Sequence, residues 1–114
     1  MTHQMNLHAA PFDMIARGSK TIELRLYDEK RRRIKVGDEI VFTHSKYATR
    51  TLRCRVIALH VFASFEELYN TLPLLKCGYT EADIATASPA DMDLYYTKEQ
   101  QAQNGVVGIE IELI

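Results

Sequence analysis

One stretch near the start of the chain gathers side chains that could bind an anion or carry out acid–base chemistry. After Gly18, which can turn the backbone freely, an amine, a hydroxyl, a carboxylate and a guanidinium follow closely: Lys20, Thr21, Glu23 and Arg25. A lysine beside a carboxylate can act as nucleophile or general base when burial lowers its pKa, and as an anion anchor when it stays charged. Polar side chains at every second position are also typical of a solvated strand face. Judged by spacing alone, this interpretation is slightly favoured over a functional site.

A second stretch holds the densest positive charge in the chain. Between Lys30 and Lys35 there are five cations in six residues: Lys30, Arg31, Arg32, Arg33 and Lys35. Such runs are usually solvated faces, and Asp28 and Glu29 partly offset this one. The functional interpretation is a rim that contacts phosphate groups, and the sequence leaves both interpretations open.

Two adjacent tyrosines, Tyr95 and Tyr96, follow a short helix expected near Pro89. One tyrosine is expected to pack in the core. The other could stack on a nucleobase, a contact that contributes roughly 1–3 kcal/mol per base in single-strand binders. The sequence does not decide which tyrosine takes which place.

Several other kinds of site are excluded. The chain has neither GxxxxGK[ST] nor GxGxxG, the motifs that cradle nucleotide phosphates. Its four histidines are scattered without the spacing of a tetrahedral metal site, and no metal or cofactor is expected. His60 lies in an apolar part of its strand and is expected to be a core or rim histidine with one hydrogen bond.

The composition is that of one ordinary globular domain, residues 1–114, with 46% hydrophobic and 25% charged residues. No run of about 18 apolar residues predicts a membrane span, and the N-terminus lacks the regions of a secretion signal. Cys54 and Cys77 are therefore expected to be reduced, and the protein cytoplasmic. The oligomeric state is left open.

The net charge of −1 hides an asymmetry between the two halves of the chain. Residues 1–55 hold 12 Lys and Arg against 6 Asp and Glu, whereas residues 56–114 hold 2 against 9. Any contact with nucleic acid should therefore be local to the first half. Its affinity should be modest, because non-specific binding grows with the number of phosphates neutralised.

The elements that must position these residues begin with a short apolar edge strand at Met5–Leu7. Pro11 suits the first turn of a helix, which Gly18 ends in a left-handed conformation. Residues 20–26 alternate strictly between apolar and polar side chains, which predicts a half-buried strand with a polar row facing away from the core. The next segment, 27–33, is expected to be a charged loop or strand end.

Further strands are expected at 40–43, 51–61 and 106–113, with a hairpin connection at 44–50. Within 51–61 the alternation gives way to apolar residues on both sides, which indicates either entry into a buried environment or a bulge. Helix starts are expected at Ser64, Thr80, Ser88 and Thr97. Five or six short strands with short helices between them predict an α+β fold, a small β-barrel with helices packed at its ends.

Taken together, these residues resemble the ASCH domain family, which is similar to the PUA domains of RNA-modifying proteins. The resemblance covers nearly the whole chain and is carried by Met5-Asn6-Leu7, Pro11-Phe12, Ile15, Gly18-x-Lys20-Thr21-Ile22-Glu23-x-Arg25-Leu26, Asp28-x-Lys30-Arg31, Ile34, Gly37-Asp38-x-Ile40-x-Phe42, Tyr95-Tyr96 and Gly105-Val106-Val107-Gly108-Ile109-Glu110. It implies a PUA-like barrel with a cleft between barrel and helices. RNA binding, in connection with translation or transcription coactivation, is the role usually proposed for such domains.

One bacterial branch of this family hydrolyses N4-acetylcytidine to cytidine and acetate. The resemblance places the lysine of that branch at Lys20, but its threonine three residues later is replaced by Glu23, and an ionised carboxylate cannot donate a proton. Candidates for its distant glutamate are Glu66, Glu67 and Glu81. Ribonuclease activity, proposed for other members of the family, is a further enzymatic alternative.

We therefore expect a binding module that receives RNA, a nucleotide or a modified nucleoside in a cleft around the GxKTxExR strand. The candidate binding residues are Lys20, Thr21, Glu23, Arg25, Lys30, Arg31, Arg32, Arg33, Tyr95 and Tyr96. The enzymatic alternative is an amidohydrolase acting on N4-acetylcytidine or a related nucleoside, with Lys20 as nucleophile or base and Glu23 as proton shuttle. A third possibility is a protein-interaction domain with no nucleic-acid role.

Overall fold

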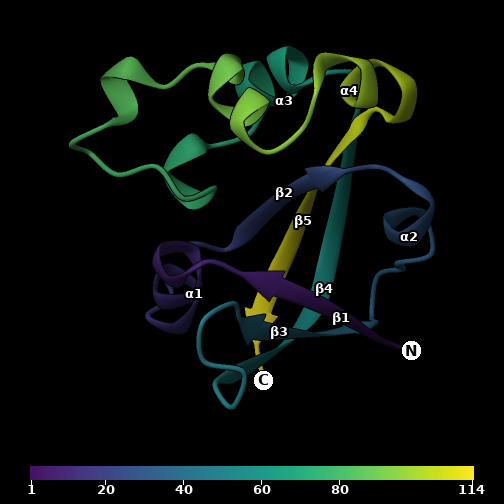
Figure 1. Cartoon of the computed structure of the whole chain (residues 1–114), viewed down its shortest axis with the longest axis vertical. Coiled ribbons are helices and arrows are strands. Elements are labelled where there is room, and N and C mark those ends of the chain that lie inside the picture. Colours follow the sequence, from purple (N-terminus) through teal and green to yellow (C-terminus); the bar gives the residue numbers. More distant parts are fainter.

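Five strands form a single curled sheet in the order β1-β3-β4-β5-β2 (Figure 1). The computed structural model describes all 114 residues. The strands are β1 (Thr2–Leu7), β2 (Ile22–Leu26), β3 (Glu39–His44), β4 (Thr51–Phe62) and β5 (Val106–Leu113). Only β1 and β3 pair in parallel, and every other pair is antiparallel. The sheet is a half-barrel with β1 and β2 as its two edges, so the expected α+β class and barrel-like core are confirmed.

Two long basic side chains join the edge strand β1 to the part of the chain around β2. Nη2 of Arg25 donates to the carbonyl oxygen of Asn6 at 2.8 Å, and Nζ of Lys30 donates to that of Gln4 at 2.7 Å. An edge strand presents unpaired carbonyl groups, which need hydrogen-bond partners when they are shielded from water. Side chains thus satisfy backbone groups that a closed barrel would satisfy with another strand.

Short helices connect these strands. They are α1 (Ala9–Ala16), α2 (Glu29–Arg32), α3 (Phe65–Thr71), α4 (Lys98–Asn104) and three 3₁₀ helices, η1 (Leu74–Lys76), η2 (Ile84–Thr86) and η3 (Pro89–Leu94). Three of the four expected caps are present, since Ser64, Ser88 and Thr97 each accept a backbone hydrogen bond from the helix they precede. The helix start expected at Thr80 is wrong: turns follow Thr80, and η2 begins only at Ile84. None of these helices has the length and the hydropathy that a membrane-spanning segment requires.

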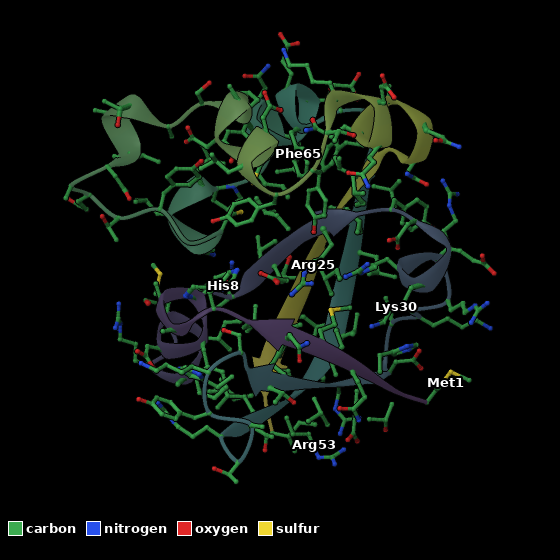
Figure 2. The ribbon with its side chains drawn as sticks, viewed as in Figure 1. Met1, His8, Arg25, Lys30, Arg53 and Phe65 are labelled. Atoms are coloured by element: carbon green, nitrogen blue, oxygen red, sulfur yellow. The ribbon has the colours of Figure 1, made fainter.

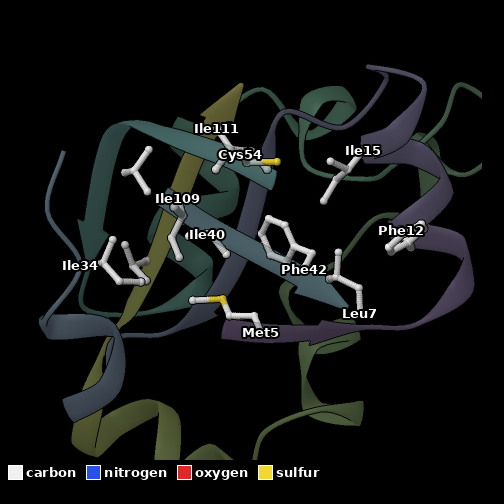
Figure 3. Packing of buried hydrophobic residues seen from close by; sticks show 12 residues of the cluster. Met5, Leu7, Phe12, Ile15, Ile34, Ile40, Phe42, Cys54, Ile109 and Ile111 are labelled. Atoms are coloured by element: carbon white, nitrogen blue, oxygen red, sulfur yellow. The ribbon is translucent and has the colours of Figure 1, made fainter. Parts of the chain in front are cut away.

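Hydrophobic side chains pack on both faces of the sheet. Inside the curl, residues from β1, α1, β3, β4 and β5 form one cluster, which includes Phe12, Ile40, Phe42 and Ile109 (Figure 3). On the other face, α3 and η3 cover a second cluster that contains Ile22, Leu24 and Leu26 of β2. The helical segment from α3 to η3 is therefore fixed to the sheet along β2, the strand with the polar row (Figure 1).

Two local expectations need correction, and one open alternative is decided. The polar row of β2 is not solvated, because Glu23 is buried within the protein. Residues 29–32 form the short helix α2 rather than a loop, since the side chain of Asp28 caps it by accepting from the backbone N–H of Arg31. For β4 the bulge is confirmed and burial is not, because the register shifts between Val56 and Ala58 and no residue of the strand beyond Val56 is buried.

Candidate functional site

A cleft of about 420 Å³ separates the curled sheet from the helical segment above it. The side formed by β1, α1 and β2 contributes Asn6, Leu7, His8, Ala10, Pro11, Met14, Lys20, Glu23, Leu24 and Arg25. The opposite side contributes Tyr69, Cys77, Gly78, Tyr79, Asp83, Asp91, Met92, Leu94, Tyr95 and Tyr96. Figure 2 shows His8 and Arg25 where the two sides face each other. A volume of this size suits a small organic ligand such as a nucleoside.

The floor of the cleft is a buried ion cluster centred on Glu23. Oε1 of Glu23 lies 2.8 Å from Nζ of Lys20, and Oε2 accepts a hydrogen bond from Nε of Arg25 at 2.8 Å and lies 2.7 Å from its Nη2. All three side chains are at most 14% exposed. The spacing produces this geometry because Glu23 and Arg25 lie on the same face of β2, while Lys20 lies in the turn that Gly18 opens with a φ of 82°.

Glu23 is held in its ionised form by its two cationic neighbours. Burial alone would raise the pKa of this carboxyl, but the charges of Lys20 and Arg25 and their hydrogen bonds outweigh it, so the pKa is lowered. A carboxylate of this kind accepts hydrogen bonds and orients cations. It leaves two protons of Lys20 and the Nη1 group of Arg25 without partners in the chain, so these donors can serve a ligand.

The turn at Gly78 packs against the side chain of Lys20. Gly78 has a φ of 110°, and a Cβ atom at that position would lie 3.4 Å from both Cδ and Nζ of Lys20. The neighbouring Cys77 is a free thiol, and burial raises its pKa to about 11. At neutral pH it is therefore protonated and is a poor nucleophile.

The opposite wall is aromatic and carries a chain of hydrogen bonds. The hydroxyl groups of Tyr69 and Tyr79 lie 2.6 Å apart, and that of Tyr79 donates to Oδ2 of Asp91 at 2.7 Å. Tyr96 is partly buried and stacks on Phe65, with 6.3 Å between the ring centroids. Tyr95 is 61% exposed and lies at the mouth of the cleft.

The basic run on α2 lies outside the cleft, and its side chains have partners within the chain. Arg31 contacts Asp28 at 2.8 Å and Arg33 contacts Glu29 at 2.7 Å. Arg32 donates to the carbonyl of Asn104 and lies over the ring of Tyr27. Lys30 bonds to β1, and burial together with the charges of Arg31 and Arg25 lowers its pKa.

The cleft therefore brings together some of the sequence-derived candidates and not others. It includes Lys20, Glu23, Arg25, Tyr95 and Tyr96, whereas Thr21 and the basic run do not line it. Glu66, Glu67 and Glu81, the candidates for a distant glutamate, also do not line it; Asp83 and Asp91 are its other acidic residues. Nowhere in the chain are three or more His, Cys, Asp or Glu side chains placed to hold a metal ion.

Sequence reasoning missed the wall opposite β2. Tyr69 reads as one residue of the apolar stripe of α3, and nothing in the spacing links it to Tyr79 or Asp91. These residues meet because α3 and η3 pack against the same cluster. One sequence signal does point to Asp91: it is the acidic residue of the S-x-x-D capping box that begins at Ser88.

Comparison with known proteins identifies both the family and its fold. The family model of the ASCH domain matches residues 5–114. The crystal structure of the hypothetical protein PH0355 shares 34% sequence identity with this chain, covers 100% of both chains and gives a TM-score of 0.82. The solution structure of PF0455 from Pyrococcus furiosus is 33% identical, with a TM-score of 0.74 over 100% of this chain and 98% of that one.

More distant structures agree in fold alone. The ASCH domain from Lactobacillus crispatus is 14% identical, with a TM-score of 0.66 over 98% of this chain and 79% of that one. Among curated proteins, none matches the chain.

Proposed function

This chain belongs to the ASCH domain family, and on that premise we propose that its cleft binds a nucleoside unit, free or at an accessible position in RNA. The observation that carries the proposal is the buried Lys20–Glu23–Arg25 cluster at the floor of a cleft whose other side holds four tyrosines. In this arrangement the charged groups bind polar atoms of the base, and an exposed tyrosine supplies a stacking surface.

The size and lining of the cleft favour one nucleoside over a long strand of nucleic acid. Its charged residues include two cations, Lys20 and Arg25, against the three carboxylates of Glu23, Asp83 and Asp91. A surface that tracks a phosphate backbone carries an excess of positive charge. The cleft therefore favours a base and its ribose, with phosphate groups left outside.

Phosphate contacts, if the ligand is RNA, fall to the exposed side of α2. Arg32 and Arg33 are exposed, and Arg33 is held by Glu29 in an ion pair that is open to water. Such a pair contributes little and can exchange its partner for a phosphate. Few such contacts are available, so we expect oligonucleotide affinity to be modest and to fall with salt.

Hydrolysis of N4-acetylcytidine or a related modified nucleoside would use the same cleft, with Lys20 as nucleophile or base. That reaction needs an uncharged amine at Lys20. The ion pair that Nζ of Lys20 forms with Glu23 at 2.8 Å suits an anchoring role for this side chain instead. Glu23, with its lowered pKa, is also unsuited to the role of proton shuttle. Binding is therefore the function that this geometry supports best, with amidohydrolase or ribonuclease activity as the alternative.

Isothermal titration with nucleosides and with short single-stranded RNAs across a salt series tests the proposal. We expect saturable binding that is nearly independent of salt for nucleosides and weakens with salt for RNA. Tyr95→Ala should weaken both by about tenfold, because it removes an exposed stacking surface. Tyr47→Ala is the matched control, since Tyr47 is 51% exposed and does not line the cleft.

Two results would count against binding as the function. One is the absence of heat with every nucleoside and RNA at low salt. The other is turnover of N4-acetylcytidine, detected by chromatography, that Lys20→Ala abolishes and Tyr47→Ala leaves intact. The second result would identify the amidohydrolase.

A further inference from the structure

The hydrogen-bond chain on the cleft wall has a fixed direction. An ionised carboxylate can only accept, so the hydroxyl proton of Tyr79 points to Asp91, which lies 2.7 Å away. The hydroxyl of Tyr79 therefore has no second proton to give to Tyr69. In the 2.6 Å hydrogen bond between the two hydroxyl groups, Tyr69 must be the donor and Tyr79 the acceptor. Burial and the hydrogen bonds to Tyr69 and Asp91 raise the pKa of Tyr79, which keeps its proton in place.

This direction leaves the part of the wall formed by Tyr69, Tyr79 and Asp91 with acceptors only. Both phenolic protons are used within the chain of hydrogen bonds, and the remaining lone pairs belong to the oxygens of Tyr69 and Tyr79. Asp91 adds a further acceptor in Oδ1, because its Oδ2 already accepts from Tyr79 and from the backbone N–H of Ser88. All three residues line the cleft, and Tyr69 is only 8% exposed.

The two cations in the floor of the cleft contribute donors. Lys20 and Arg25 retain N–H groups without partners in the chain, and neither side chain can accept a hydrogen bond. A ligand that spans the cleft can therefore accept hydrogen bonds from Lys20 and Arg25 on the side of β2 and donate to Tyr69, Tyr79 and Asp91 on the opposite side.

We propose that the Tyr69–Tyr79–Asp91 wall determines specificity, by selecting bases whose edge carries an exocyclic amino group beside an acceptor. Cytosine and adenine have such an edge. Uracil and hypoxanthine carry a carbonyl oxygen in place of the amino group, and that oxygen faces another acceptor at the wall. The inference rests on the proposed function of the cleft, and it adds the class of base that the cleft takes.

The test measures the affinity of the wild-type chain for cytidine, uridine, adenosine and inosine by isothermal titration at one salt concentration. We expect cytidine to bind about tenfold more tightly than uridine, and adenosine more tightly than inosine by a similar factor. This is the ratio expected when one hydrogen bond is replaced by two acceptors that face each other.

Two tyrosine variants assign the selectivity to the wall. In Tyr79→Phe the hydroxyl of Tyr69 loses its acceptor and becomes free to donate into the cleft, so the preference for cytidine over uridine should shrink to about twofold or less. In Tyr69→Phe the bond from Tyr79 to Asp91 remains and Tyr79 still presents an acceptor, so the preference should persist. Tyr47→Phe, outside the cleft, should leave all four affinities unchanged.

The possible failures can be told apart. Equal affinity of the wild type for amino and carbonyl nucleosides would overturn the selectivity and leave the proposed binding function in place. A preference that survives in Tyr79→Phe, with a melting temperature close to that of the wild type, would overturn the assignment of the selectivity to the two tyrosine hydroxyls. No binding of any of the four nucleosides would overturn the proposed function together with this inference.

Discussion

At the scale of single residues, Glu23 decides the character of the site. Its carboxylate is shared by Lys20 and Arg25, all within 2.8 Å, in a place from which water is largely excluded. Removing one member of a buried ion cluster leaves an uncompensated charge and strongly lowers the free energy of unfolding. Replacing the whole cluster with apolar side chains, in contrast, is often neutral or stabilising. The cluster is therefore better understood as preorganised for a ligand than as a source of stability.

We predict that Glu23→Gln lowers the free energy of unfolding by roughly 3–5 kcal/mol, because two buried cations lose their shared anion. Urea denaturation at neutral pH measures the change. Glu29→Gln is the control: its side chain is 85% exposed, so its ion pair with Arg33 should contribute less than about 1 kcal/mol. Equal small losses in both variants would show that the cluster is solvated.

The lowered pKa of Glu23 also fixes the sign of its pH dependence. Its contribution to stability is fully present above the unfolded value of 4.5 and is lost as the pH falls through the lower folded value. The difference in stability between wild type and Glu23→Gln should thus be constant above about pH 5 and shrink in acid. A difference that grows as the pH falls would contradict the direction of the shift.

The residue types of the floor, but not their burial, could be predicted from the sequence. GxKTxExR gives the order of the charges and predicts that Glu23 and Arg25 share one face of β2. Whether that face is wet depends on the curl of the sheet and on β1, which lies far away in the sequence. Arg25 donates a hydrogen bond to the carbonyl oxygen of Asn6, and no local sequence pattern predicts that contact.

At the scale of elements, two glycine turns offer a controlled test of how the backbone positions Lys20. Gly78 and Gly37 both have positive φ, 110° and 95°, and both should lose roughly 1–2 kcal/mol when replaced by alanine. Only at position 78 would the new Cβ lie against Lys20, because at position 37 nothing lies within 4 Å.

We therefore predict that Gly78→Ala weakens nucleoside binding several-fold while Gly37→Ala does not, although the two variants lose similar stability. Titration of both variants below their melting temperatures measures the affinities. If binding weakens equally in both, the effect comes from general loosening of the fold rather than from displacement of Lys20.

A second element-level prediction concerns the contact between β1 and the turn before β3. Asp38 accepts from His3 Nε2 at 2.8 Å and from the backbone N–H of Lys35 at 3.0 Å, and these bonds lower its pKa to about 2. Stability from a carboxylate with a depressed pKa is present above its ordinary value of 3.8 and is lost as the pH falls toward 2.

Asp38→Asn should accordingly be less stable than the wild type at pH 6, and the gap should close between about pH 4 and pH 2. Thermal unfolding followed by circular dichroism across this range gives the comparison. A gap that is independent of pH would mean that ionisation of Asp38 contributes nothing to holding β1.

Elements with strong local signals were the predictable part of the fold. Capped helices, the hairpin between β3 and β4 and the closing strand β5 follow from caps, turns and alternation. The segment from Thr80 to Leu94 was less predictable, because its 3₁₀ helices are short and Met92 of η3 packs in the same cluster as Tyr69 of α3, which is distant in sequence. That segment carries much of the second wall of the cleft.

At the scale of the whole molecule, the cleft follows from an incomplete barrel. The sheet curls without closing, so its edge strands β1 and β2 are not paired with each other. The cleft lies beside these edges, and the segment from α3 to η3 forms its other side (Figure 1). The halves of the chain differ in charge accordingly: the basic half supplies the floor donors, and the acidic half supplies the acceptor wall. The average composition of the chain conceals this division.

The central claim, that the cleft rather than the basic run on α2 is the ligand site, is tested most directly by mapping backbone amide shifts. A ¹⁵N-labelled sample titrated with cytidine should show saturable changes at Lys20, Gly78 and Tyr95, with one affinity for all three. The amides of Lys30 to Arg33 should remain unperturbed. Changes confined to α2, or none at saturating cytidine, would contradict the account.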